Sequence, residues 1–419
     1  MITSQLSEYI CNTDYNQLPP SVVEKAKLCF IDFLGVSLRG SNTESGLAIR
    51  DILNYGHEST VIGHGKASAL EASLANGIFA HALDLDDGHR WAQLHPGACV
   101  MPAALSLCEK YGKNGCEFIN SVVVGYEVTI MLGLMVNPGH RRRGFHSTGT
   151  CGTFGAAAAA SNILNLDQEQ TMDALGLAGT QAAGLLESDH SGSMGKHLHT
   201  GRAAQSGVLS TLLTKKGFNG PHTIFEGDEG FLKAMTDIDI HKTLSPMALD
   251  KFKILEVYFK IYPVCRHLHS SIEALLHIIN NKDLKKGEIE KITVETYGIA
   301  AEHDDYHPQT SAAIRQSLPV SLAIAFLKRN LKVEDLYITD EISDEIEELS
   351  SKIVIQEKKE LDELYPHQRP SHVIINTANK LYEKKIDLAW GEPEKPLRKA
   401  DIVKKFTDLN PQVNGEVLE

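Results

Sequence analysis

Several features that mark redox, secreted and metal-binding proteins are scarce in this chain of 419 residues. Aromatic residues make up only 6% of it, and its seven cysteines form no C-x-x-C pair and are odd in number. This pattern does not suit a framework of structural disulfides or a cysteine-based zinc site. We therefore expect reduced, mostly buried thiols in a cytoplasmic protein, at Cys11, Cys29, Cys99, Cys108, Cys116, Cys151 and Cys265.

Positive charge and long apolar runs are scarce as well. The chain carries 41 basic and 54 acidic residues, a formal net charge of −13, so we expect neither nucleic acid nor a membrane as a partner. The most apolar run, 118–136, contains Asn120 and Glu127, which favours a buried helix. The first residues, MITSQLSEYICNTDY, lack the basic-then-apolar order of a signal peptide. An anionic substrate would need a local basic pocket.

The motifs of several enzyme classes are missing. In STVIGHGK (59–66) the first glycine and the hydroxyl of a phosphate loop would fall on Thr60 and Ala67, so the Walker motif is excluded. The chain has no G-x-G-x-x-G after a strand, no G-x-S-x-G and no H-E-x-x-H. These absences argue against a dinucleotide fold, a serine hydrolase and a zinc protease. Acid–base chemistry by Asp, His and Lys without a cofactor remains.

Helices rich in small residues dominate the first half of the chain. Apolar spacing predicts helices over 3–13, 19–38, 67–83, 98–111, 115–135, 168–186 and 203–216. Ala and Gly allow such helices to pack closely, which points to a helical bundle. From about residue 250 the pattern changes: strands are predicted over 288–298, 372–378 and 380–388, and helices over 315–328 and 333–360. We expect a mainly α fold with an α+β part.

The stretch 81–97, HALDLDDGHRWAQLHPG, concentrates side chains that ionise near neutral pH. It follows a core-forming helix, and charged groups beside a core are costly to desolvate without a chemical reason. Mixed N/O ligands could bind a divalent cation here: Asp84, Asp86, Asp87, His89 and His95. Because no metal motif accompanies them, we expect no metal and interpret the stretch as an active-site loop.

Two further glycine-rich breaks carry ionisable groups. In GHRRRGFHSTGTCGTFGAAAAA (139–160), glycines at 149, 152 and 155 either admit an anion to backbone N–H groups or allow tight helix packing. The arginines at 141–143 favour a solvated turn or an interface over a substrate clamp. LESDHSGSMGKHLHTGRAA (186–204) is interpreted as a loop that ends a helix. One histidine alone is more often structural, so it is the recurrence of such breaks that favours acid–base chemistry.

Four runs, in this order, resemble the MmgE/PrpD family: EASLANGIFAHALDLDDGH…HPG, GFHSTGTCGTFGAAAAA, GKHLHTGRAA and FKIYPVCRHLH. The resemblance covers roughly residues 5–405. The family includes 2-methylcitrate dehydratase, cis-aconitate decarboxylase and iminodisuccinate epimerase. It implies a large all-helical domain, 1–248 with 392–419 returning to it, and a smaller α+β lid domain, 249–391. It also implies a homodimer that needs no metal or organic cofactor.

The resemblance implies site residues as well. Asp84 matches the aspartate that opens the D-x-D-D motif, His95 the histidine of HPG, and His146 the histidine of GFH. Lys196 matches the lysine before L-H-x-G, and Lys260 the lysine of FKIYP. The implied roles are proton transfer by the two histidines, orientation by Asp84, and carboxylate binding by the two lysines, of which one could be the base if desolvation lowers its pKa.

At two positions the chain departs from the decarboxylase pattern. Gly88 replaces the threonine that commonly follows D-x-D-D, and Val320 in RQSLPVS replaces a tyrosine of the lid helix. Asp86 and Asp87 are expected to shape the loop by accepting backbone N–H bonds. Further substrate contacts are predicted at Arg202, Gly88 and His199.

The resemblance implies proton abstraction next to a carboxylate of a di- or tricarboxylic acid similar to aconitate, 2-methylcitrate or iminodisuccinate. The two departures favour an isomerase, epimerase or dehydratase over a decarboxylase. Two alternatives stay open: cis-aconitate decarboxylase, and a non-catalytic protein that binds carboxylates on the same scaffold.

Overall fold

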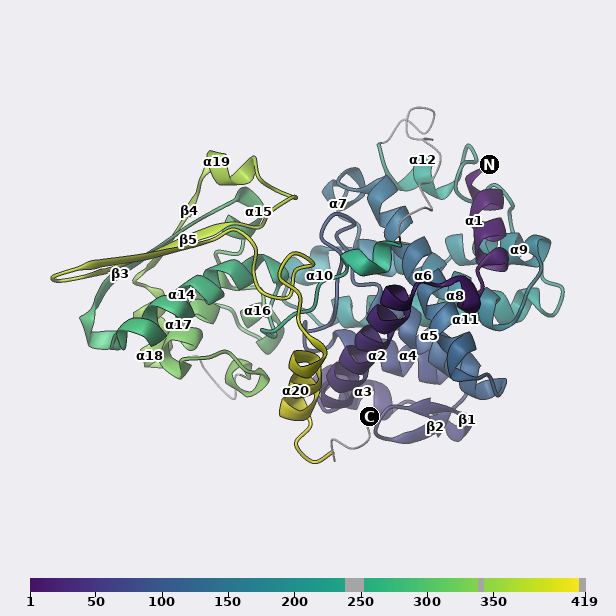
Figure 1. Ribbon diagram of the computed structural model, residues 1–419, viewed down its shortest axis with the longest axis horizontal. Coiled ribbons are helices and arrows are strands. Elements are labelled where there is room, and N and C mark those ends of the chain that lie inside the picture. Colours follow the sequence, from purple (N-terminus) through teal and green to yellow (C-terminus); the bar gives the residue numbers. More distant parts are fainter. Residues whose placement is uncertain (238–251, 338–342, 414–419) are drawn as a thin grey trace.

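The computed structural model describes residues 1–237, 252–337 and 343–413, and it has two parts that lie side by side (Figure 1). The helical part lies at the right of the view and contains the helices up to α12 together with a small hairpin. The α+β part lies at the left and contains a four-stranded sheet with its helices. The predicted fold class, mainly α with an α+β part, is confirmed.

The helical part follows the first half of the chain. Its elements are α1 (Ile2–Asn12), α2 (Pro20–Gly40), α3 (Glu44–Arg50), β1 (Tyr55–Val61), β2 (Gly65–Ala67), α4 (Ala69–His81), α5 (Gly97–Lys110), α6 (Gly115–Val136), α7 (Gly139–Arg142), α8 (Ser147–Ile163), α9 (Gln168–Gly179), α10 (Glu187–His190), α11 (Gly195–Thr214) and α12 (Phe231–Met235).

Helix α8 forms the centre of the helical part, where it packs against α5, α6 and α11. A Cβ added at Gly155 would lie 1.7 Å from Oγ1 of Thr129, and one at Gly152 would lie 2.6 Å from Sγ of Cys99. Only glycine lets the neighbouring helices approach this closely. The tight-packing interpretation of these glycines is confirmed.

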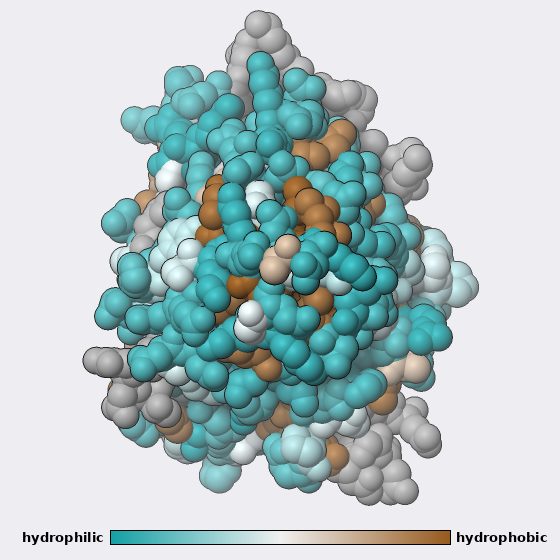
Figure 2. Space-filling view, turned by 90° about the vertical axis from the view of Figure 1, so that its left-hand side faces the viewer, coloured by the Kyte–Doolittle hydropathy of each residue, from teal (hydrophilic) through white to brown (hydrophobic). Residues whose placement is uncertain are grey.

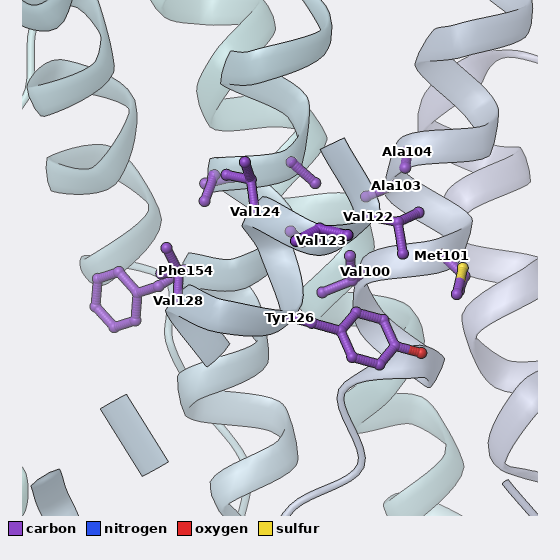
Figure 3. Close-up of a cluster of buried hydrophobic side chains, with 14 of the residues drawn as sticks. Val100, Met101, Ala103, Ala104, Val122, Val123, Val124, Tyr126, Val128 and Phe154 are labelled. Carbon is purple, nitrogen blue, oxygen red and sulfur yellow. The ribbon is translucent and has the colours of Figure 1, made fainter. Parts of the chain in front are cut away.

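Helix α6 is long and apolar enough to cross a membrane, judged by length and composition, but 89% of its most apolar window is buried inside the protein. Figure 3 shows its side chains Val123 and Tyr126 in the core beside Val100 of α5. Core helices of globular proteins share this composition. The prediction of a buried helix over 115–135 is confirmed.

The α+β part contains α14 (His269–Lys282), β3 (Ile289–Thr296), α15 (Gly298–Ala301), α16 (Ser311–Ile314), α17 (Leu318–Lys328), α18 (Asp344–Ser350), β4 (Ile353–Glu357), α19 (Lys359–Asp362), β5 (Ser371–Thr377) and β6 (Leu381–Ile386). The sheet order is β4-β3-β5-β6. Strand β3 pairs in parallel with β4 and antiparallel with β5. The alternate side chains Ile292, Val294 and Val373 are buried in one cluster with residues of α14 and α17. Seen from this end, the surface is mainly hydrophilic (Figure 2).

Three predicted elements differ from the structure. The run 333–360 was expected to be helical, but Ile353–Glu357 is strand β4, because its β-branched residues pair with β3. The helix predicted over 168–186 ends at Gly179. The segment interpreted as a loop around residue 196 is helical from Gly195 onward, where it forms the first turns of α11.

The end of the described chain returns to the helical part. Helix α20 (Lys399–Leu409) packs against α2, and Lys405 makes a 2.6 Å ion pair with the buried Asp32. The domain boundary predicted between 248 and 249 lies outside the described residues.

Candidate active site

A polar pocket lies between the two parts and offers a volume of about 70 Å³. Five of the predicted site residues line it: Asp84, His95, His146, Lys196 and Lys260. The first four come from the helical part, and Lys260 lies in the segment that precedes α14. Residues that are up to 176 positions apart in the chain therefore meet at one place.

Asp84 is the centre of the charged side of the pocket. It lies in the loop after α4 with a φ of 49°, a left-handed conformation that aspartate tolerates better than most residues. Its carboxylate accepts hydrogen bonds from Nζ of Lys260 at 2.5 Å and from Nε2 of Gln316 at 2.9 Å, and Lys196 lies 3.4 Å away. Burial opposes ionisation, but Lys196 and Lys260 hold the pKa of Asp84 well below its usual range.

Lys196 projects from the first turn of α11, between Asp84 at 3.4 Å and Asp189 at 4.0 Å. Burial would lower its pKa, but these two carboxylates outweigh burial and raise it. Lys196 is thus held as a cation. The geometry favours carboxylate binding by this lysine over the alternative role of base.

His95 is a neutral imidazole with one hydrogen-bonded nitrogen. Its Nδ1–H donates to the backbone carbonyl of Asp87 at 2.6 Å, because a carbonyl can only accept. Burial lowers the pKa of His95 to about 3, so the ring is uncharged near neutral pH. Its Nε2 makes no hydrogen bond to any described residue and has a lone pair available for a proton.

His146 is the second imidazole of the pocket and lies at the N-cap of α8. Its Nδ1 lies 3.1 Å from Nδ1 of His199, so one of these nitrogens carries the shared proton. Burial, with the nearby His81 and Lys196, holds the pKa of His146 well below its usual range. His199 therefore contacts His146 and does not line the pocket itself.

The two following carboxylates of the loop hold its shape. Asp87 accepts the N–H of Gly97 at 3.1 Å and the O–H of Tyr126 at 2.7 Å, and burial raises its pKa to about 7. Asp86 instead bonds Nδ1 of His81 at 2.8 Å. The loop-shaping prediction for Asp87 is confirmed, whereas Asp86 orients an imidazole and accepts no backbone N–H that the structure shows.

The ligand set proposed for a metal is dispersed by these contacts. Asp84 pairs with two lysines, and His89 bonds Glu256 at 3.1 Å. The described residues do bring ligand atoms of His81, Asp86 and His95 within 4.8 Å of one another. Asp86 and His81 already bond each other at 2.8 Å, a contact that orients the imidazole of His81.

Gly88 makes room for Tyr258, which lines the pocket in its place. The two backbones exchange hydrogen bonds at 3.1 and 2.9 Å, and a Cβ on Gly88 would lie 2.4 Å from the hydroxyl of Tyr258. A threonine here would collide with the phenol. At this place the chain therefore presents the phenol of Tyr258 and not a threonine side chain. Arg202 is exposed, bonds Gln205 and lies away from the pocket.

Three arginines of the pocket escaped the sequence prediction: Arg141, Arg266 and Arg369. The sequence predicts a solvated turn or an interface for Arg141, but the structure places this residue in the lining of the pocket. The buried carboxylate of Glu392 forms ion pairs with Arg266 at 3.0 Å and with Arg369 at 3.6 Å. It also pairs with Arg90, which lies outside the pocket lining, at 3.2 Å. Arg369 is only 5% exposed, and its Nε and Nη1 find no hydrogen-bond acceptor among the described residues.

The chain matches two family models over most of its length. Residues 4–242 match the MmgE/PrpD N-terminal domain, and residues 262–418 match the MmgE/PrpD C-terminal domain.

Curated relatives include a cis-aconitate decarboxylase-like protein of Aspergillus oryzae, 28% identical over 74% of this chain and 69% of that protein. A cis-aconitate decarboxylase of Aspergillus terreus is 26% identical over 86% and 79% of the two chains. The cis-aconitate decarboxylase of Homo sapiens is 23% identical over 97% and 87%. With both domain models matched in order, this chain belongs to the MmgE/PrpD family.

Proposed function

We propose that this protein is a cofactor-independent isomerase or lyase that removes a proton next to a carboxylate of a di- or tricarboxylic acid. One observation carries the proposal: neutral imidazoles, among them His95 and His146, and a surplus of cations line the same pocket. The cations are Arg141, Lys196, Lys260, Arg266 and Arg369, and the carboxylates are Asp84 and Asp189.

The surplus cations suit an anionic substrate. The surplus lies with the arginines: Asp84 and Asp189 pair with Lys196 and Lys260, whereas Arg266 and Arg369 share the single carboxylate of Glu392. Arg141 lines the pocket as a third arginine. Nε and Nη1 of Arg369 have no hydrogen-bond acceptor among the described residues, so this guanidinium retains donors for a substrate carboxylate. A substrate with two or more carboxylates would occupy the lysine side and the arginine side together.

Binding of this kind also prepares the chemistry. A cation beside the carboxylate stabilises the negative charge that develops when the neighbouring carbon loses its proton. His95 is neutral and keeps one nitrogen free, so it can accept that proton. Return of the proton to the carbon gives isomerisation or epimerisation, and loss of a β-hydroxyl gives dehydration.

Cis-aconitate decarboxylase is the second candidate, favoured by the names of the relatives. Two positions of this chain weigh against it. Gly88 lacks the threonine side chain of that pattern, and Val320 is fully buried in the apolar core of the α+β part, where it offers no hydroxyl.

The test is proton NMR of cis-aconitate, 2-methylcitrate and iminodisuccinate incubated with the protein in deuterated water. We expect deuterium in at least one acid, with isomer or dehydration product and little loss of carbon dioxide. Stoichiometric release of carbon dioxide from cis-aconitate would favour the second candidate. Binding of these acids with neither exchange nor product would favour the non-catalytic alternative.

A further inference from the structure

Among the pocket residues that have no role in the chemistry above are Cys265 and His303, which lie beside each other. Both belong to the α+β part: Cys265 precedes the turn at Arg266–Leu268, and His303 follows α15. Sγ of Cys265 lies 3.6 Å from Nε2 of His303, a distance at which thiol and imidazole share a proton.

The orientation of His303 is fixed by the backbone. Its Nδ1 lies 2.9 Å from the carbonyl oxygen of Gln316, and since a carbonyl only accepts, Nδ1 carries a hydrogen. Nε2 is then the nitrogen that faces the thiol. The side chain of the same Gln316 donates to Asp84 at 2.9 Å, so one residue holds both the imidazole and the central carboxylate of the pocket.

The surroundings favour the charged form of this pair. Burial would raise the pKa of Cys265, but the charge and hydrogen bond of His303 outweigh it and lower the pKa to about 7. Asp84 acts against the thiolate and Lys196 supports it. The ring of His267 stacks 5.7 Å from that of His303, and Arg141 disfavours an imidazolium there.

Within the described residues, no hydrogen bond joins another buried cysteine to a histidine. Burial raises the pKa of Cys29, Cys99 and Cys151. The pair at 265 and 303 is therefore a local arrangement and not a general property of the thiols of this chain.

We infer that Cys265 and His303 form a second acid–base pair, which exchanges a proton with the reacting carbon from the α+β side of the pocket. The inference rests on the proposed function and deepens it. With His95 contributed by the helical part, the substrate would lie between acid–base groups of both parts, an arrangement that suits inversion at carbon.

The proton steps balance without an added reagent. His95 takes the proton from the carbon and becomes an imidazolium, while the C–H electron pair stays on the substrate and delocalises into its carboxylate. The proton on Nε2 of His303 passes through Sγ of Cys265 to the carbon, which leaves a thiolate beside a neutral imidazole. His95 then releases its proton to water, and His303 takes one from water.

The first experiment needs no substrate. The far-ultraviolet absorbance of the thiolate is titrated with pH in the native protein and in Cys265→Ser, and the difference isolates this thiol. We expect a midpoint near 7 for Cys265. In the His303→Gln background the same difference should move to or above the ordinary thiol value of about 8.5. A midpoint that His303→Gln leaves unchanged would overturn the pair.

The second experiment tests catalysis. Deuterium exchange into the acid that responds in the NMR test is compared for the native protein, Cys265→Ser and the exposed-site control Cys116→Ser. We expect Cys265→Ser to lose about 100-fold or more in rate, with a changed pH profile, and the control to lose nothing. Full activity of Cys265→Ser would overturn the inference and leave the proposed function standing. No exchange by the native protein would instead overturn the proposed function, and the titration would still judge the pair.

Discussion

The two sides of the pocket are built in different ways. The helical side draws its groups from one loop and from the first residues of α8 and α11, and burial keeps its imidazoles neutral. The α+β side takes its groups from positions scattered between Tyr258 and Arg369, several of them held by the buried Glu392. We infer a division of labour in which the helical side supplies the base His95, and the α+β side supplies two of the three pocket arginines together with the acid–base pair Cys265–His303.

We expect the largest effect on activity from removal of His95, the proposed base. In His95→Ala the pocket keeps its cations and loses the imidazole that accepts the proton, so we expect turnover to fall by about 100- to 10,000-fold while KM changes little. Steady-state kinetics with a circular dichroism check of folding would measure this. Near-native turnover would show that His95 is not the base.

The second largest effect should come from loss of the buried carboxylate of Glu392, and it should appear in the stability of the protein. Glu392→Gln would leave Arg90, Arg266 and Arg369 without their shared counter-charge, and all three are at least 95% buried. We expect the free energy of unfolding to fall by about 3–5 kcal/mol. Urea denaturation measures the change, and the surface variant Glu334→Gln, whose ion pair with Arg39 is exposed, should change it little.

Arg369 should separate binding from chemistry. Because its Nε and Nη1 have no acceptor among the described residues, Arg369→Met should weaken substrate binding with only a small effect on the proton-transfer step. We expect KM to rise by about 10- to 100-fold, as for loss of hydrogen bonds to a charged group. A fall in kcat with unchanged KM would contradict the assignment of anion binding to this side.

The neutral histidines of the helical side should make the protein sensitive to acid. Burial lowers the pKa of His197 to about 3, so this stability contribution is complete above the unfolded pKa of about 6.5 and is lost as pH falls toward the folded value. When the pH falls from about 7 to about 5, we expect the unfolding free energy of the native protein to fall by about 2 kcal/mol more than that of His197→Gln. Equal losses in urea titrations at the two pH values would contradict the neutral state of His197.

Removal of divalent cations should have the smallest effect. The grouped atoms of His81, Asp86 and His95 are satisfied in part by the 2.8 Å bond between Asp86 and His81. We expect protein treated with EDTA and passed through a chelating resin to keep its full activity. A loss that one divalent metal restores would place an ion in this trio.

The difference between the two sides also explains what could be predicted from sequence. Asp84, His95, His146 and Lys196 lie in short motifs with small-residue helices around them, and the structure places all four around one pocket. The helices themselves follow from apolar spacing. Strand β4 was missed because its pairing with β3, and not its charged neighbourhood, decides its conformation.

The arginine side offered no comparable signal. Arg369 precedes a proline and a strand, and nothing in the neighbouring sequence indicates that its guanidinium ends in the pocket. The fold alone brings it to Glu392 and Tyr258. Cys265 was closer to recognition, because it lies inside the run FKIYPVCRHLH, but its partner His303 lies 38 residues further along the chain.

The position of Glu392 restricts how the two matched domains can be separated and recombined. This carboxylate from the chain's last quarter bonds Arg90 of the acidic loop, in the first matched domain, and Arg266 and Arg369 in the second. The first domain expressed alone would leave the buried Arg90 without its partners Glu392 and Glu394, whereas the second domain keeps Glu392 beside Arg266 and Arg369. A chimaera that joins the first domain of this chain to the second domain of another family member would therefore have to keep a carboxylate that faces Arg90.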